Sequence, residues 1–355
     1  MKTLKYVFVY LLIIELGLNF YQPVNTAYGY RMDYSIVKDN LDNIDIILQK
    51  ISKEVHSNKK DDYIIILGDS VAFSGPGPSS QSIGYYMQQL ANDSPGDIKK
   101  IYNLSMPAMQ TGDIYTMLLK LDKYGISTQN IIINIIYAGF IERKPAPAIV
   151  FWLKDDLRKM DYQTFQHIKP QLLANGYQEK QEFNQLTRNY IETHLALFRY
   201  RAIIKTNLNN HYQSLRYGKP TDDSIGDARP WYKKKELPGI LKQPEYQQVF
   251  SSQPFDMTEN NPQIYFMNKI IDHQQGSNTL VFLAGVNDTL MKDQVIDPDY
   301  QKNLALIDNY FAGQPMQYLN CQGRIDPQYF TDHIHLTSDG YRQLAKILWN
   351  SFNRE

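Results

Sequence analysis

The chain has 355 residues, with 37 Lys or Arg against 37 Asp or Glu, so its formal net charge at neutral pH is zero. Without a net positive charge, the protein has no overall positive field to attract nucleic acid, so we do not expect a nucleic-acid partner. Cys321 is the only cysteine, which excludes an internal disulfide and any cysteine-based metal cluster and indicates a small buried side chain.

The amino terminus predicts export. Two lysines within the first five residues precede the apolar run Tyr6–Ile14, as in a signal sequence. Extended to Phe20, the run is just long enough to cross a bilayer. We therefore expect residues 1–27 to anchor an extracytoplasmic protein in the cell membrane. A signal peptide cleaved near residues 25–27, with secretion of the remainder, is the alternative, and a buried helix of a cytosolic protein is a third.

Residues 28–60 are polar and predict a linker helix, because their apolar residues recur near helical spacing at Ile36, Leu41, Ile44, Ile47, Leu48 and Ile51. Residues 61–355 then read as one domain. From 144 to 278 the pattern turns rich in Tyr, Gln and Asn and is too long for a loop, so we expect a helical insertion there. Its aromatic residues, Trp231 among them, suit either a small core or sugar-stacking surfaces.

Short apolar runs predict buried strands at 62–67, 100–104, 130–136, 279–284 and 316–319. Amphipathic helices are predicted between them. Ser79 or Ser80 is a candidate cap for the first of these helices, Gly125 marks the end of the second, and the last begins at Thr337. Alternating strands and helices of this kind predict a parallel, doubly wound α/β sheet.

Ser70 ends the stretch Gly68-Asp69-Ser70, directly after the first predicted strand. The carboxyl ends of strands in open α/β sheets are where ligands bind, so a hydroxyl there is a candidate nucleophile. The competing interpretation is a polar turn, since Gly, Asp and Ser are common turn residues. Asp69 is expected to shape this turn by accepting hydrogen bonds from backbone N–H groups.

Near the other end, two residues separate Asp332 from His335 within Asp-His-Ile-His. A serine needs a base to take its proton, and a carboxylate that orients the base. With two residues between them, a tight turn can bring the carboxylate to one ring nitrogen while the other faces Ser70. Asp332, His333 and His335 as metal ligands form the alternative, although no further ligand cluster is visible. We expect His333 to point away and to have no role.

Gly-Asp-Ser early and Asp-x-x-His late resemble the GDSL or SGNH hydrolase family. The resemblance implies a flavodoxin-like three-layer α/β/α sandwich with a five-stranded parallel sheet in the order two-one-three-four-five, interrupted here by the helical insertion. It also implies that Ser70, Asp332 and His335 are catalytic, without a cofactor. Glu15-Leu16-Gly17-Leu18 with Phe20 and Pro23 is similar to the start of many membrane-tethered members.

The family's second block commonly has a glycine whose N–H binds the oxyanion, and Ala108 stands at the matching position. With the N–H of Ser70 it is our candidate oxyanion donor, provided the local dihedrals suit alanine. Ala138 occupies the position of the family's third-block asparagine. Asn287, in Gly285-Val286-Asn287-Asp288, follows the fourth strand instead and is either a further donor or a turn-forming residue.

This resemblance implies a serine esterase that removes acyl groups, acetyl first among them, from a cell-envelope or secreted polysaccharide or another small ester. One alternative is transfer of the acyl group to a glycan hydroxyl, with a membrane protein as acyl donor. A second is a non-catalytic envelope protein that binds glycan or a partner.

Overall fold

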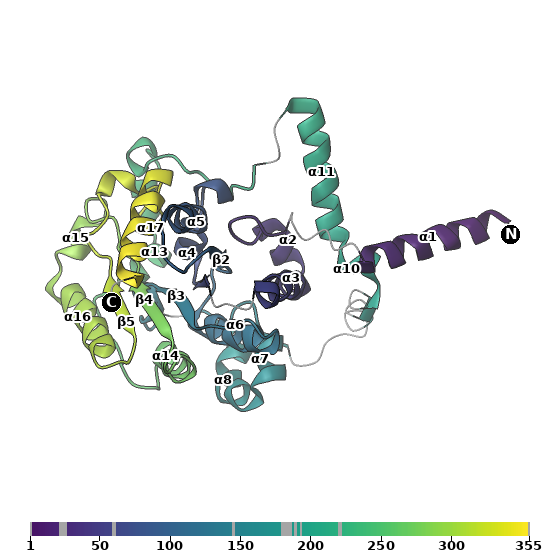
Figure 1. Ribbon diagram of the computed structural model, residues 1–355. Helices are drawn as coiled ribbons and strands as arrows, with labels where there is room; N and C mark the ends of the chain where they lie inside the picture. The colour runs from purple at the N-terminus through teal and green to yellow at the C-terminus, as the bar shows by residue number, and fades with distance from the viewer. Residues whose placement is uncertain are drawn as a thin grey trace.

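The sheet forms the centre of the molecule (Figure 1). Its five strands are all parallel and follow the order β2-β1-β3-β4-β5. They are β1 (Tyr63–Leu67), β2 (Lys100–Asn103), β3 (Asn130–Ile135), β4 (Asn278–Leu283) and β5 (Gln317–Asn320). The predicted strands and the flavodoxin-like three-layer α/β/α architecture are confirmed. The computed structural model describes residues 2–20, 27–58, 62–143, 146–178, 187, 190–191, 194–218 and 222–353.

The central strands are buried on both faces, because helices cover both sides of the sheet. On one side, α5 (Ile83–Asp93) packs against α17 (Ser338–Phe352) over Ile64 and Ile132. On the other side, the covering helices are α6 (Thr111–Lys123), α14 (Pro262–His273) and α16 (Pro298–Ala312). The two apolar layers hold the strand ends in fixed register.

Helix boundaries agree with the sequence signals in two places and differ in one. Gly125 has φ 65° and follows α6, and the Thr337 side chain caps α17, both as predicted. At α5 the cap is Ser82, whose Oγ accepts from the N–H of Tyr85. The expected caps belong instead to the 3-10 turn η2 (Ser79–Gln81), because the chain makes one more turn before the helix.

The segment at residues 28–60 is more than a linker between the amino-terminal helix and the domain. It forms α2 (Tyr34–Asp39) and α3 (Asp42–Asn58), and α3 shares its apolar core with α6. The ammonium group of Lys120, 1% exposed, lies 2.6 Å from the Asp45 carboxylate of α3. This segment is therefore an integral part of the domain.

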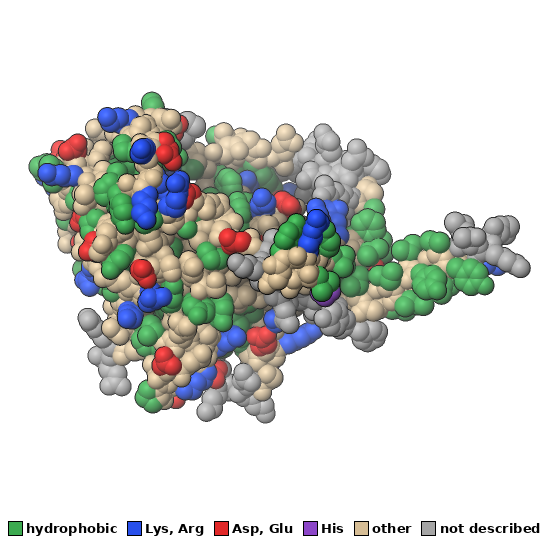
Figure 2. All heavy atoms as spheres, turned by 90° about the horizontal axis from the view of Figure 1, so that it is seen from above, with side chains coloured by type: hydrophobic (Ala, Val, Ile, Leu, Met, Phe, Trp, Pro, Cys, Tyr) green, Lys and Arg blue, Asp and Glu red, His purple; other side chains and the backbone are tan. Residues whose placement is uncertain are grey.

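Helix α1 (Lys2–Phe20) projects away from the body (Figures 1 and 2), and its apolar side chains from Tyr6 to Leu16 are exposed. The Glu15 carboxylate accepts the backbone N–H groups of Ala196 and Leu197 at 2.5 and 3.0 Å. Among the residues that the structure describes, no helix combines the length and the hydropathy that crossing a bilayer requires. The cleavage site expected at 25–27 falls mainly outside the described residues.

The insertion begins after the 3-10 turn η3 (Tyr137–Gly139). Its end lies earlier than the expected residue 278, because α14 is the helix that joins β3 to β4 across the sheet. Trp231 donates its indole N–H to the carbonyl of Pro327 at 2.9 Å and packs against both apolar cores. The described helices of the insertion are α7 (Lys154–Met160), α8 (Tyr162–Ala174), α10 (Ala196–Arg199), α11 (Arg201–Tyr217), η4 (Trp231–Lys233), α12 (Leu237–Leu241) and α13 (Pro244–Gln248).

Short elements occupy the ends of the strands where the candidate site residues lie. They are α4 (Ser70–Phe73), α15 (Lys292–Val295) and η5 (Pro327–Tyr329). Because all five strands are parallel, their carboxyl ends share one edge of the sheet, and these elements follow β1, β4 and β5 on that side.

Candidate active site

Ser70 stands where β1 turns into α4. Gly68 has φ 155°, a conformation that favours glycine, and a Cβ there would lie 2.4 Å from the Cβ of Asn134 on β3. Asp69 then caps α4, its Oδ1 accepting the N–H of Val71 at 2.8 Å, as its sequence position predicts. The turn leaves Ser70 half-buried at the carboxyl end of the strand.

Asp332 and His335 lie in the segment between η5 and α17. One carboxylate oxygen of Asp332 accepts the backbone N–H groups of Ile334 and His335 at 2.9 and 2.8 Å, which closes a tight turn. The other oxygen lies 2.8 Å from Nδ1 of His335. The carboxylate therefore fixes both the backbone and the ring.

The structure brings Ser70 to this pair. Its Oγ lies 2.8 Å from Nε2 of His335. An ionised Asp332 carboxylate can only accept a hydrogen bond, so the neutral His335 ring carries its proton on Nδ1. Nε2 is then free to accept a hydrogen bond from the Ser70 hydroxyl. The three side chains form one continuous hydrogen-bonded chain.

Their charges support one another. Burial alone would raise the pKa of Asp332, but the charge and hydrogen bond of His335, with smaller contributions from His333 and the N–H of Ile334, hold it well below its usual range. Burial alone would lower the pKa of His335, but the Asp332 carboxylate raises it above its usual value. The carboxylate and the ring therefore favour each other's charged form.

Asp69 is a second carboxyl group near the imidazole. It is 7% exposed, and burial raises its pKa to about 6, against the opposing effects of the Val71 N–H and the charge of His335. It lies at the floor of the site as a backbone cap.

Ala108 lies in the loop between β2 and α6, with φ 61°. This is the left-handed region that glycine prefers, so the backbone of the expected glycine is retained although the residue is alanine. Among the described residues, neither the N–H of Ala108 nor that of Ser70 donates to a protein acceptor. Both remain available to a bound oxygen.

Asn287 is fully buried, and its hydrogen bonds are with two loops. Its backbone N–H donates to the carbonyl of His333 at 2.9 Å, and its amide nitrogen lies 3.4 Å from the carbonyl of Asp332. Its amide oxygen accepts the N–H of Leu290 at 3.0 Å. These contacts tie Asn287 to the loop that carries Asp332, and the bond to Leu290 is typical of a turn-forming asparagine.

In the described segment that follows β3, residues 136–143, no side chain is an amide. Ala138 lies within η3, and the hydroxyl of its neighbour Tyr137 donates to the carbonyl of Ser251 at 2.9 Å. Asn134 of β3, which the sequence analysis did not single out, is 2% exposed and donates to the carbonyl of Ile135, leaving its Oδ1 unpartnered. A polar residue within an isoleucine-rich strand was the available signal.

His333 points away from Ser70. Its ring packs edge-on against Phe250 at 5.4 Å and Tyr246 at 6.0 Å, both from the insertion. Within the described ranges, no three His, Cys, Asp or Glu side chains are grouped so that they could hold a metal ion.

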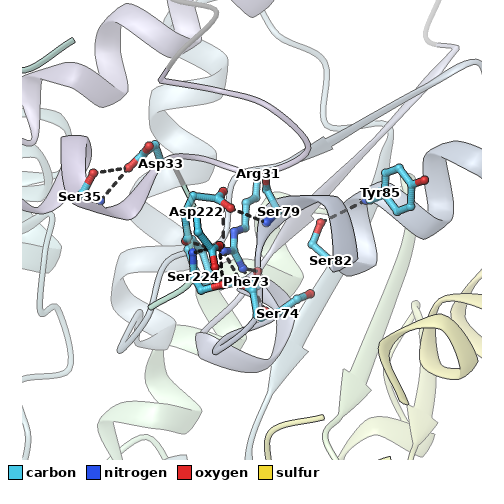
Figure 3. A network of polar contacts seen from close by, with 12 residues as sticks. Arg31, Asp33, Ser35, Phe73, Ser74, Ser79, Ser82, Tyr85, Asp222 and Ser224 are labelled. Carbon is cyan, nitrogen blue, oxygen red and sulfur yellow. Dashed lines mark hydrogen bonds and ion pairs between the residues drawn. The ribbon is translucent and has the colours of Figure 1, made fainter. Parts of the chain in front are cut away.

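Arg31 joins three segments, among them the end of α4 at Phe73 and Ser74 (Figure 3). Its guanidinium, 1% exposed, donates to the carbonyls of Phe73, Ser74 and Gly77 at 2.9, 3.0 and 2.8 Å. It also donates to the carbonyl of Asp223 in the insertion at 3.2 Å. Sequence reasoning missed this residue, because backbone carbonyls carry no sequence signal.

No family model matches the chain, and neither does any curated protein. Among solved structures, it is similar to a lipolytic protein of the G-D-S-L family from Veillonella parvula DSM 2008, with a TM-score of 0.33 and 10% identity over 82% of this chain and 99% of that one. It is also similar to the acetyl xylan esterase Est2A from the rumen bacterium Butyrivibrio proteoclasticus, with a TM-score of 0.28 and 8% identity over 83% of this chain and 65% of that one.

Proposed function

We propose that this protein is a serine esterase that removes an acyl group, acetyl in the first place, from an ester-bearing carbohydrate. The observation that carries the proposal is the unbroken chain from the Ser70 hydroxyl through His335 to Asp332, with both hydrogen bonds at 2.8 Å. Such a chain is the arrangement that nucleophilic acyl chemistry needs.

In this mechanism, Ser70 Oγ attacks the ester carbonyl as Nε2 of His335 takes its proton. The Asp332 carboxylate stabilises the imidazolium that forms. Collapse of the tetrahedral intermediate breaks the bond to the leaving alcohol, which receives the proton from His335. Water then attacks the acyl-serine with the same base, releasing the acid and restoring Ser70.

The developing oxyanion would be bound by the backbone N–H groups of Ser70 and Ala108. The left-handed backbone of Ala108 and the unused N–H groups support this role. Without a side-chain amide after β3, the site has one donor fewer than the family pattern. Removing one such donor lowers kcat by about a hundredfold or more, so we expect a slow enzyme unless the natural substrate completes the hole.

Transfer is the second candidate, because a sugar hydroxyl can replace water with the same base. A cleft of about 910 Å³ beside the site offers room for an acceptor. In that case we propose that a membrane protein delivers the acyl group, as the location of the chain outside the cytoplasm would require.

We propose the membrane-proximal, extracytoplasmic location on two grounds: the basic flank of residues 1–27 and the exposed apolar side chains of α1. Secretion after cleavage remains the alternative. Surface labelling of intact cells with a fluorophosphonate probe that does not cross membranes tests this location.

Turnover of p-nitrophenyl acetate by the purified chain tests the function. We expect steady release of p-nitrophenol that is lost in Ser70→Ala and retained in Ser57→Ala, an exposed serine of α3. No turnover, or turnover that survives Ser70→Ala, contradicts the proposal and favours a glycan-binding role. A burst without steady turnover, restored by an oligosaccharide that becomes acylated, favours transfer.

A further inference from the structure

The cleft beside the candidate site has two walls. One is the segment after β3, from Gly139 to Arg143, and the other is formed by insertion residues 247–256. Gln110, Gly139 and Gln263 line both this cleft and a small cavity that Asp69 borders. The cleft therefore adjoins the cavity that borders the turn before Ser70.

The lining is polar but nearly neutral. Amide and hydroxyl side chains dominate it: Gln110, Gln171, Gln247, Gln248, Ser251, Ser252, Gln253, Asn260, Asn261 and Gln263. Phe140, Phe250 and Phe255 supply aromatic faces. Hydrogen-bonding amides beside aromatic rings suit the hydroxyls and the apolar ring faces of sugars.

Arg143 departs from this neutral pattern. Its Nε is buried without a hydrogen-bond partner, and burial lowers the pKa of the guanidinium with no charge among the described residues to offset it. The two carboxylates of the lining do not compensate. Asp256 accepts the hydroxyl and the N–H of Thr258 at 2.6 and 2.8 Å, and Glu142 is exposed and has an interaction of its own.

A partly buried cation that has no anionic partner among the described residues is costly, so a partner from outside the protein is the economical explanation. The planar fork of arginine matches two carboxylate oxygens. Among the described residues that line the cleft, Arg143 is the only Lys or Arg, which balances a single negative charge better than a phosphate dianion.

We propose that Arg143 binds a carboxylate of the substrate, and that the ester cleaved at Ser70 is carried on an acidic glycan such as a uronate polymer. This inference rests on the proposed esterase function. The amide side chains would bind the sugar hydroxyls, and Arg143 would place the acidic residue so that the neighbouring acyl ester faces Ser70.

Paired substrates test the inference: an O-acetylated oligogalacturonate and the same oligosaccharide with its carboxyl groups methyl-esterified. For the unmodified protein, we expect kcat/KM to be about tenfold to a hundredfold higher for the acidic form, the usual range for a charge-assisted hydrogen-bonded pair. Added salt should raise KM for the acidic form only.

Arg143→Gln should reduce this preference by about the same factor, and Arg143→Lys should retain part of it. Arg216→Gln, the same change at an exposed residue of α11, should leave the preference unchanged. Equal turnover of both substrates by the unmodified protein, or a preference that survives Arg143→Gln, overturns the inference while the esterase function stands.

Binding of the deacetylated oligogalacturonate, measured by calorimetry, keeps the two proposals separate. If p-nitrophenyl acetate is not turned over, the esterase proposal fails. Binding that is lost in Arg143→Gln and kept in Arg216→Gln would still support the carboxylate site. Absence of binding to the unmodified protein would overturn it.

Discussion

The indole N–H of Trp152 donates to the carbonyl of Pro107 at 2.8 Å, which ties the start of the insertion to the residue before Ala108. The fully buried Asp113 carboxylate fixes the same segment, because it accepts the N–H groups of Phe151, Trp152 and Leu153 at 2.8–2.9 Å. The insertion thus supports the loop that contains Ala108, whose N–H group we propose as an oxyanion donor.

The left-handed backbone of Ala108 leads to a prediction about residue size. Left-handed backbone costs an L-residue about 1–2 kcal/mol, and most of this is relieved by glycine, which loses about 0.5–1 kcal/mol through backbone entropy. We expect Ala108→Gly to keep or slightly raise the free energy of unfolding and to retain esterase activity.

Ala108→Val should have the opposite effect to Ala108→Gly, because a β-branched side chain tolerates the left-handed conformation poorly. It should lower the free energy of unfolding by about 1–2 kcal/mol and reduce kcat. Denaturant unfolding and p-nitrophenyl acetate kinetics measure both effects. A valine variant as stable and active as the unmodified protein would show that the loop does not need this backbone.

The paired charges of His335 and Asp332 predict a pH profile. His335 must be neutral to accept the Ser70 proton, and Asp332 raises its pKa above the usual 6.5. The activity should therefore fall as the pH is lowered through a value above 6.5. In Asp332→Asn this raising charge is lost, so the acidic limb should move to lower pH while the maximal rate drops. An unchanged limb would argue that another group controls the profile.

Asn287 is predicted to act through the loop that holds Asp332. Asn287→Ala leaves the Leu290 N–H and the Asp332 carbonyl without their partners, which should cost about 1–3 kcal/mol of unfolding free energy. We expect kcat to fall by about tenfold with KM little changed, because the loop is less well positioned. A loss of a hundredfold or more with full stability would instead assign it to the oxyanion.

Arg31 is predicted to hold residues 70–77, the segment that begins with Ser70. Arg31→Ala removes the donors to Phe73, Ser74 and Gly77 and should destabilise the protein by about 3–5 kcal/mol, as for other broken buried charge contacts. Arg31→Lys keeps the charge but cannot span all three carbonyls, and should lie between. Hydrogen exchange should report faster opening of residues 70–77 in both variants. Unaltered exchange there would contradict this role.

Much of the sheet could be predicted from the sequence, because isoleucine-rich strands buried on both faces leave a clear signal. The juxtaposition of Ser70 and His335 also followed from the topology, since parallel strands bring their carboxyl ends to one edge. The end of the insertion was harder to predict from the sequence. Helix α14 looks like any amphipathic helix of a polar segment until its contact with α6 is known.

The residues around the site were harder to predict for a physical reason. Arg31 binds backbone carbonyls, and Asn287 binds the backbone of a loop 45 residues away, so their partners have no side-chain identity to recognise. The sequence around Arg143 does not show that its side chain has no partner. Only the surrounding packing shows that its Nε is buried without a partner.

Reaction of the purified protein with a fluorophosphonate, followed by peptide mass mapping, tests the central claim most directly. We expect one covalent adduct, on Ser70, formed much more slowly in His335→Ala because the base that activates the hydroxyl is gone. No adduct under conditions that label a known serine esterase, or an adduct on another serine with Ser70 unmodified, would contradict the account.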